Sequence, residues 1–229
     1  MRRVAFISDV HSNLEALNAV VESLGDEELF CLGDIVGYGS NPNEVIRILE
    51  DRGAVCLLGN HDAAVLTGDT SWFNSAAAIA AKWTTKQLSD RSLAYLRKLP
   101  LQIRVELEGV RTYLTHGSPD DNLHEYVDPV THTDLFGHYL SKLDVGLVGL
   151  GHTHLPFVWT GDEGTVFNPG SVGQPRDGDW RASFAVVGFG RRKPEAVLQR
   201  TEYDCEKASE KIVKAGLPAS LGRRLLRAP

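Results

Sequence analysis

The chain has 229 residues, which is enough for one large domain or for a domain with a small extension. Hydrophobic residues make up 42% of it and charged residues 24%, as is ordinary for a globular protein, and this length permits a substantial core without disulfides. The net charge of −6 argues against a general nucleic-acid coat protein, which would be basic, but it does not argue against small phosphorylated substrates.

The cysteines and the apolar runs indicate the compartment. Three cysteines without regular spacing do not suggest a disulfide framework, and Cys31 and Cys56 lie in apolar runs where buried, reduced thiols are expected. The apolar run at residues 4–7 is too short for a signal peptide, and no stretch approaches the roughly 20 apolar residues of a membrane span. We therefore expect a soluble, cytoplasmic protein with no membrane partner.

The first part of the chain alternates strand and helix signals. Apolar runs predict strands at residues 3–8, 28–32 and 54–58. Helical spacing predicts a helix that begins after Asn13 as N-cap and reaches residue 24, and another from Pro42 to about residue 53. Three strand-loop-helix units in a row imply a parallel or mostly parallel sheet that is covered by helices.

The second part begins with a long segment, residues 63–99, that is predicted to be helical until Pro100 ends it. A hairpin follows, with a turn at Glu108-Gly109. Further elements are expected as a helix at residues 133–143 and strands at residues 101–107, 110–115, 145–148, 157–160, 165–167, 182–187 and 196–203. This half is predicted to be antiparallel.

Residues 204–229 read as a C-terminal tail, with an amphipathic helix to residue 227 that is broken near Pro218. Its apolar side suits either a cap on the main sheet structure or a homodimer contact. Its basic end, Arg223-Arg224 with Arg227, reads as a solvated helix end, with an acidic partner or RNA as the alternative. No repeat or linker divides the chain, so residues 1–229 are expected to form a single domain.

Five apolar runs end in the same way, because each delivers Asp, His or Asn at its carboxyl end. The five are Ser8-Asp9-Val10-His11, Leu32-Gly33-Asp34, Leu58-Gly59-Asn60-His61-Asp62, Leu114-Thr115-His116-Gly117 and Gly149-Leu150-Gly151-His152-Thr153-His154. One such loop alone is as often surface chemistry or chance. Five of them converging on one site would form a metal centre.

The candidate ligands are Asp9, His11, Asp34, Asn60, His116, His152 and His154. Oxygen and imidazole ligands suit divalent first-row metals, and the absence of cysteine ligands argues against a structural zinc site. Seven ligands are too many for one metal with an open position, but they fit two metals that share a carboxylate. Two ions about 3.5–4 Å apart would clamp the oxygens of a displacement at phosphorus and would lower the pKa of a shared water.

The order of these motifs resembles the calcineurin-like metallophosphoesterases, and most closely their small bacterial and archaeal branch without a capping domain. Residues 168–176, Asn-Pro-Gly-Ser-Val-Gly-Gln-Pro-Arg, are also similar to that branch. The resemblance implies an α/β fold, a four-layer αββα sandwich in which helices flank two mixed β-sheets. It further implies two divalent metal ions per chain, with Mn favoured and Fe, Zn, Ni, Co or Mg as alternatives.

The resemblance also implies roles for single residues. Asp9, His11 and His154 would hold the first metal. Asn60, His116 and His152 would hold the second, and Asp34 would bridge the two. His61 would not bind metal but would be the catalytic residue that stabilises transition-state charge and assists departure of the leaving oxygen.

The chain departs from the phosphoprotein-phosphatase branch after Asp34. That branch carries Asp-Arg-Gly where this chain has Gly37-Tyr38-Gly39. The missing Asp would orient the catalytic histidine and the missing Arg would grip phosphate, so dephosphorylation of proteins is not favoured. Asp62 either supports His61 instead or is structural.

Several further residues have two readings each. Asn60, Tyr38 and Arg176 are candidates for substrate binding, although Arg176 could instead pair with Asp177 or Asp179. Trp72 and Phe73 either edge the pocket or, as we favour, pack in the core. The histidines of the polar connection are expected at the surface or in packing, and they are His124, His132 and His138.

Together these features predict a dinuclear metal-dependent phosphoesterase that hydrolyses phosphodiesters, with phosphomonoesters as an alternative, in small or nucleotide substrates. A nuclease acting on DNA or RNA is less favoured, because the chain is acidic and shows no DNA-binding extension. A non-catalytic scaffold of the same fold is the third reading, and it is disfavoured because this chain keeps every ligand and the catalytic histidine.

Overall fold

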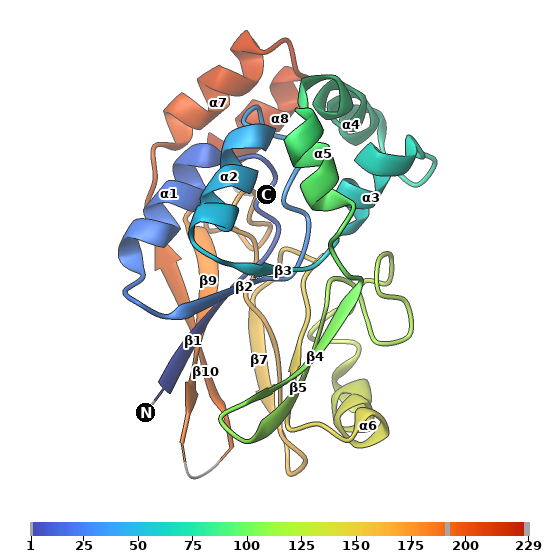
Figure 1. Cartoon of the computed structure of the whole chain (residues 1–229), viewed down its shortest axis with the longest axis vertical. Coiled ribbons are helices and arrows are strands. Elements are labelled where there is room, and N and C mark those ends of the chain that lie inside the picture. The colour runs from blue at the N-terminus through green and yellow to red at the C-terminus, as the bar shows by residue number, and fades with distance from the viewer. Residues whose placement is uncertain (1, 191–192, 227–229) are drawn as a thin grey trace.

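Two five-stranded mixed sheets form the centre of the computed structural model, which describes residues 2–190 and 193–226 (Figure 1). The first sheet has the order β10-β9-β1-β2-β3 and the second β4-β5-β6-β8-β7. The strands of the first sheet are β1 (Arg2–Ile7), β2 (Glu28–Cys31), β3 (Val55–Cys56), β9 (Ala182–Phe189) and β10 (Glu195–Thr201). Those of the second are β4 (Gln102–Leu107), β5 (Val110–Thr115), β6 (Leu147–Gly149), β7 (Phe157–Thr160) and β8 (Thr165–Asn168).

Helices cover the outer face of each sheet. The described helices are α1 (Leu14–Ser23), α2 (Pro42–Asp51), α3 (Asn60–Thr67), α4 (Ser75–Gln87), α5 (Asp90–Leu96), α6 (Thr133–Leu143), α7 (Cys205–Lys214) and α8 (Ala219–Leu226). One apolar core joins α1, α2, α4, α5, α7 and α8 to the first sheet, and another joins α6 to the second (Figure 1). The four-layer αββα sandwich expected from the sequence is therefore confirmed. Within the described ranges, no helix is both long and apolar enough to cross a membrane.

The prediction that the second half is antiparallel was wrong in part. In the second sheet β5, β6 and β8 are mutually parallel, and the outer pairs β4/β5 and β7/β8 are antiparallel. A parallel neighbour needs a crossover connection, and the segment that contains α6 supplies it between β5 and β6. β9 and β10 belong to the first sheet instead, where β9 pairs antiparallel with β1 and β10 pairs antiparallel with β9. Periodicity alone does not reveal which sheet a strand joins.

The predicted helical stretch at residues 63–99 consists of three separate helices. α3 ends at Gly68, whose φ of 78° is a left-handed conformation that favours glycine. α4 and α5 begin at new N-caps, because the side chain of Asn74 accepts from Ala77 N–H and that of Ser89 accepts from Ser92 N–H. α3 also begins earlier than expected, at Asn60, and this places two candidate site residues in its first turn.

Other sequence expectations are confirmed. Asn13 caps α1 by accepting from Ala16 N–H at 3.2 Å. Cys31 and Cys56 are buried and free. The tail is broken between α7 and α8, and its apolar side chains, among them Ile212 and Leu225, pack in the core of the first sheet. The tail therefore caps the sandwich. The expected end of its helix at Arg227 lies outside the described residues.

The two sheets pack on each other through a core that contains Phe6, which is fully buried. Its ring stacks on the ring of Phe30, with 5.3 Å between centroids, and makes an edge-to-face contact with the ring of Phe167, with 5.0 Å between centroids. This packing fixes the carboxyl ends of β1 and β2 beside those of β5 and β6.

The substitution Phe6→Ala is expected to lower the free energy of unfolding by about 3–5 kcal/mol, because it leaves a cavity between the sheets. Phe6→Leu should lower it less, since it retains most of the apolar volume. Urea unfolding followed by circular dichroism measures both. If the two variants unfolded at the wild-type urea concentration, the sheets would not depend on this contact.

Candidate metal centre

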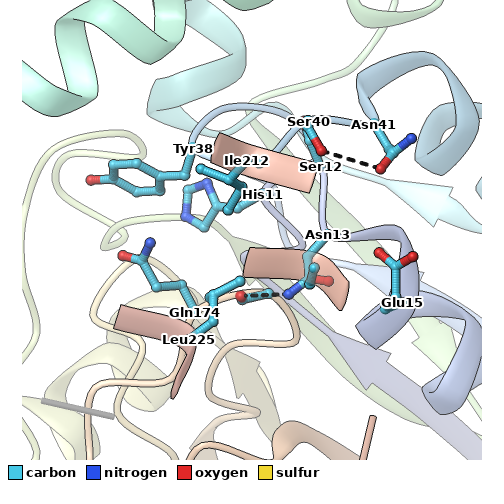
Figure 2. A pocket seen from close by; sticks show the side chains of 13 residues that line it. His11, Ser12, Asn13, Glu15, Tyr38, Ser40, Asn41, Gln174, Ile212 and Leu225 are labelled. Carbon is cyan, nitrogen blue, oxygen red and sulfur yellow. Dashed lines mark hydrogen bonds between the residues drawn. The ribbon is translucent and has the colours of Figure 1, made fainter. Parts of the chain in front are cut away.

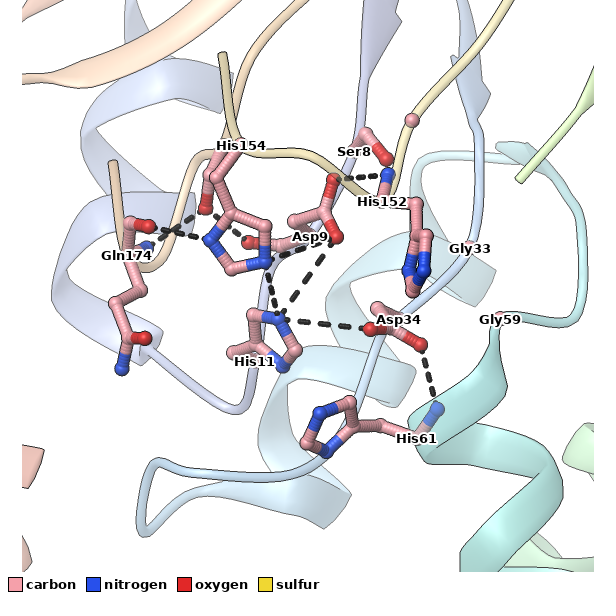
Figure 3. Close-up of polar contacts among 12 residues, drawn as sticks. Ser8, Asp9, His11, Gly33, Asp34, Gly59, His61, His152, His154 and Gln174 are labelled. Carbon is pink, nitrogen blue, oxygen red and sulfur yellow. Dashed lines mark hydrogen bonds and ion pairs between the residues drawn. The ribbon is translucent and has the colours of Figure 1, made fainter. Parts of the chain in front are cut away.

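All seven candidate ligands lie together beyond the carboxyl ends of β1, β2, β3, β5 and β6, and each is at most 8% exposed. Asp9, His11 and His154 form one group of ligand atoms that all lie within 4.8 Å of one another. Asp34, His116 and His152 form a second such group. Figure 3 shows the side chains of both sheets turned toward the same point.

Asp34 lies between the two groups. Its Oδ2 atom is 3.6 Å from Nε2 of His11 and 3.5 Å from Nε2 of His116. On the first side, Nε2 of His154 is 3.1 Å from Nε2 of His11 and 3.3 Å from Oδ1 of Asp9. On the second side, Nε2 of His116 is 3.1 Å from Oδ1 of Asn60. One carboxylate oxygen is thus shared by two sets of ligand atoms.

The backbone at these ligands is strained. Five of the seven have positive φ angles, and they are Asp9 (54°), His11 (49°), Asp34 (52°), His152 (67°) and His154 (62°). Such conformations cost about 1–3 kcal/mol each and persist only where the surroundings enforce them. Here the loops are joined by backbone hydrogen bonds, with Asp9 N–H donating to Gly33 and His11 N–H to Asp34, each at 3.0 Å. This concentration of strain is typical of a functional site.

Backbone carbonyls orient three of the imidazoles. The Nδ1 atoms of His11, His116 and His154 lie 3.2, 2.8 and 2.5 Å from the carbonyl oxygens of Val36, Leu32 and Gln174. A ring whose Nδ1–H donates to a carbonyl presents the lone pair of Nε2 to the centre, as in metal-binding histidines. His152 is reversed, because its Nε2 faces the carbonyl of His124 at 3.3 Å, so that Nδ1 is its ligand atom.

The charge states of Asp34, His11 and His152 suit ligation, whereas His116 would have to release a proton to bind a metal. Burial would raise the pKa of Asp34, but the neighbouring histidines, His116 above all, hold that pKa well below its ordinary value. Burial lowers the pKa of His152 to about 3 and that of His11 well below its ordinary value, so both rings are neutral. His116 differs, because burial lowers its pKa but the charges of Asp34 and Asp9, together with hydrogen bonds to Asp34 and to the carbonyl of Leu32, outweigh burial and raise that pKa to about 9.

A divalent cation fits this set of donors. Oδ1 of Asp9 is buried and has no hydrogen-bond partner among the described residues. A buried, unpaired carboxylate oxygen is costly unless a cation or a donor faces it. Carboxylate and amide oxygens combined with imidazole nitrogens are the ligands of first-row divalent metals.

His61 lies beside the centre and is held mainly by packing. Its backbone N–H donates to Oδ1 of Asp34 at 2.8 Å, and its ring stacks on Phe73 with 4.2 Å between centroids. The ring centroid of Tyr38 lies 4.4 Å from that of His61. A Cβ at Gly37 would stand 2.6 Å from Nδ1 of His61, and φ at Gly37 is +98°, so glycine is needed there.

The carboxylate of Asp62 does not hydrogen-bond the ring of His61. Its role is structural, which was one of the two roles expected from the sequence. Its carboxylate accepts hydrogen bonds from the backbone N–H groups of Ile35 (3.2 Å), Val36 (2.9 Å) and Gly59 (3.0 Å). These bonds tie the loop after β2 to the start of α3. Asp62 therefore supports the site through the backbone that carries Asp34 and Asn60.

The last residue of β8 and the segment after it brace the loop that carries His152 and His154, a role that was not predicted. Asn168 donates to the carbonyl of Gly151 at 2.7 Å and to the hydroxyl of Thr153 at 3.1 Å. Ser171 donates its hydroxyl to the carbonyl of Asp9 at 2.8 Å. The available signal was that Asn168 follows a sixth strand in the same manner as the ligands follow theirs.

The tail helices close the back of the site. A cavity of only about 10 Å³ lies behind His11, and Ile212 of α7 and Leu225 of α8 cover it (Figure 2). Gln174, whose carbonyl orients His154, lines the same space. The tail thus packs against the loops that carry the first group of ligands.

The front of the site opens into a cavity of about 170 Å³, which two of the candidate substrate-binding residues line. Tyr38 lines it, as does Arg176, which forms no ion pair with any described residue. The expected alternative partners of Arg176 are engaged elsewhere, Asp177 with Arg200 and Asp179 with Arg181.

The expectation of core packing was wrong for Trp72, whereas His124 is exposed as expected. Trp72 is 78% exposed and lies at the mouth of this cavity, and the exposed ring of His124 lines it as well. Phe73 is half-buried and lines it beside His61. Loop residues that face a cavity carry the same sequence signal as loop residues that pack or face solvent.

Comparison with known proteins agrees with this geometry. The family model described as the calcineurin-like phosphoesterase superfamily domain matches residues 2–191, and the chain belongs to this superfamily. An uncharacterized protein of Methanocaldococcus jannaschii is 40% identical over 97% of this chain and 96% of its own length.

Two solved structures are similar over almost their whole length. A metallophosphoesterase from Sphaerobacter thermophilus has a TM-score of 0.84 and 33% identity over 99% of this chain and 100% of its own. A hypothetical protein from Pyrococcus horikoshii OT3 has a TM-score of 0.90 and 22% identity over 100% of this chain and 99% of its own, which shows the shared fold. The resemblance inferred from the motifs is confirmed.

The substitution Asp62→Ala is expected to lower the free energy of unfolding by roughly 2–4 kcal/mol, because three buried N–H groups lose their acceptor. Asp26→Ala, which removes an exposed carboxylate in a turn, is the control and should leave stability nearly unchanged. Urea unfolding compares the two. Equal stability of both variants would show that the carboxylate of Asp62 does not hold the loop.

Proposed function

We propose that this protein is a metal-dependent phosphodiesterase with two divalent cations, manganese being favoured, that acts on small or nucleotide phosphodiesters. The observation that carries the proposal is the position of Asp34 Oδ2, 3.6 Å and 3.5 Å from the inward nitrogens of His11 and His116. A carboxylate oxygen shared in this way suits two cations side by side, and membership of a phosphoesterase superfamily supports hydrolysis of phosphate esters.

The grouping of the ligand atoms supports a division between the two cations. Asp9, His11 and His154 would hold the first cation, and Asn60, His116 and His152 would hold the second, with Asp34 shared. When bound, the cations supply Lewis-acid stabilisation of the phosphoryl oxygens and lower the pKa of water. Each group combines residues that follow strands of both sheets, so the packing of the two sheets on each other would hold each group together.

His61 acts on the substrate. It lines the front cavity beside Asn60, and both residues lie in the first turn of α3. The N-terminus of a helix favours negative charge, so the phosphate is drawn toward these two residues. The imidazole of His61 then hydrogen-bonds a phosphoryl or leaving oxygen and stabilises the charge that develops there.

The cationic groups of the cavity favour a diester. Among the described residues that line it, Arg176 is the one Lys or Arg side chain. A phosphodiester carries one negative charge and a monoester up to two, so a single guanidinium beside the metals suits the diester. The same scarcity disfavours a nuclease, because binding a polynucleotide relies on several Lys or Arg contacts to phosphates.

Removal of metal with a chelator is expected to abolish hydrolysis of bis-p-nitrophenyl phosphate, and added Mn(II) is expected to restore it. Asp34→Ala should not be restored, because both cations lose a ligand, and mass spectrometry of its metal content should find fewer ions per chain. Asp26→Ala, with an exposed carboxylate, is the control. Retained activity of Asp34→Ala would overturn the proposal.

His61→Ala is expected to lower kcat by about 10²–10⁴-fold, in the range of a positioned acid-base group. The metal content should stay at the wild-type value, since His61 is not a ligand in the proposed centre. Steady-state kinetics combined with metal analysis separates the two effects. A variant that kept the wild-type kcat, or that lost its metal, would contradict the role given to His61.

A further inference from the structure

The front cavity has an aromatic wall beyond the metal centre. Asn60, His61 and His152 line its inner side, while Trp72, Phe73 and Tyr126 line the same cavity farther out. Trp72 is 78% exposed and Tyr126 is 54% exposed, so both rings offer surface that the fold does not bury. A group attached to a phosphate at the metal centre would meet these rings.

The rings of this wall continue from the site itself. Tyr126 lies 4.0 Å from the ring of His152 with an interplanar angle of 32°, and Phe73 stacks on His61. Trp72 lies 5.5 Å from the ring of His124 with the same angle of 32°. Trp72 comes from the loop between α3 and α4, whereas His124 and Tyr126 come from the connection between β5 and α6. Two separate segments thus bring flat side chains to one opening.

The chemistry of the wall fits a nucleobase. Bases stack on exposed Trp and Tyr rings, and every base has a π-face. Asn74 and His124 add hydrogen-bonding groups along the same cavity, and Arg176 adds a positive charge for a phosphate. An aliphatic substituent would find an aromatic and polar lining instead of an aliphatic groove.

We propose that Trp72, together with Tyr126 and His124, forms a stacking subsite for the base of a nucleotide ester whose reacting phosphate lies at the metal centre. The inference rests on the proposed phosphodiesterase function and specifies its substrate class. Trp72 contributes binding to the part of the substrate that does not react, so its removal affects substrates with a base and spares those without one.

Two esters with the same leaving group test this inference. The p-nitrophenyl ester of thymidine 5′-monophosphate carries a base, and methyl p-nitrophenyl phosphate does not. With the Mn-loaded enzyme, Trp72→Ala is expected to lower kcat/KM for the thymidine ester about tenfold, mainly through KM, and to leave the methyl ester within about twofold of the wild type. Trp72→Phe, which keeps a ring, is the matched control and should retain most of the activity on the thymidine ester.

The outcomes separate the subsite from the phosphodiesterase. Suppose that the wild type hydrolysed both esters and that Trp72→Ala changed kcat/KM equally for both or for neither. The proposed stacking subsite would then be wrong, and the proposed phosphodiesterase function would be unaffected. If the wild type hydrolysed neither ester, the proposed function would fail, and direct binding would decide on the subsite. Thymidine monophosphate should quench the tryptophan fluorescence of the wild type and ribose 5-phosphate should not; quenching that persists in Trp72→Phe would overturn the subsite.

Discussion

The burial of two carboxylates at one place is the constraint on which the rest of the structure depends. Asp9 and Asp34 are almost fully buried, and although burial would raise the pKa of each, the histidines that surround them lower both pKa values below the ordinary value. Backbone N–H groups satisfy one oxygen of each, since His152 donates to Asp9 at 3.1 Å and His61 donates to Asp34 at 2.8 Å. The other oxygens face imidazole nitrogens, and Oδ1 of Asp9 has no donor among the described residues. Two buried carboxylates so close together are stable where bound cations offset their negative charge.

The fold is arranged to hold that cluster. Phe6 and its neighbours lock the sheets together, so the carboxyl ends of parallel strands from both sheets meet, as they do at the ligand sites of other α/β proteins. Asp62 and Asn168 tie the ligand-bearing loops together through their backbones. The tail helices seal the back behind His11, whereas Trp72 and Tyr126 leave the front open. The tail helices thus pack behind the ligands, and the open front provides the room for a substrate.

Much of this arrangement could be predicted from the sequence, because its signals are local. Asp9, His11, Asp34, Asn60, His116, His152 and His154 each follow an apolar run, and the structure brings all seven together. Sheet membership is not local, so nothing in the sequence indicated that β9 and β10 join the sheet of β1. Gly68, Asn74 and Ser89 marked the breaks between α3, α4 and α5, but the alanine-rich sequence between them obscured these signals. The exposure of Trp72 depends on where its loop lies in space, which no spacing in the sequence indicates.

The most direct test of the account is an anomalous-diffraction map from a crystal grown with Mn(II). The account predicts two anomalous peaks about 3.5–4 Å apart. One should lie among Asp9, His11 and His154, the other among Asn60, His116 and His152, and an oxygen of Asp34 should lie within bonding distance of both. A single peak, or two peaks that do not share Asp34, would contradict the dinuclear centre.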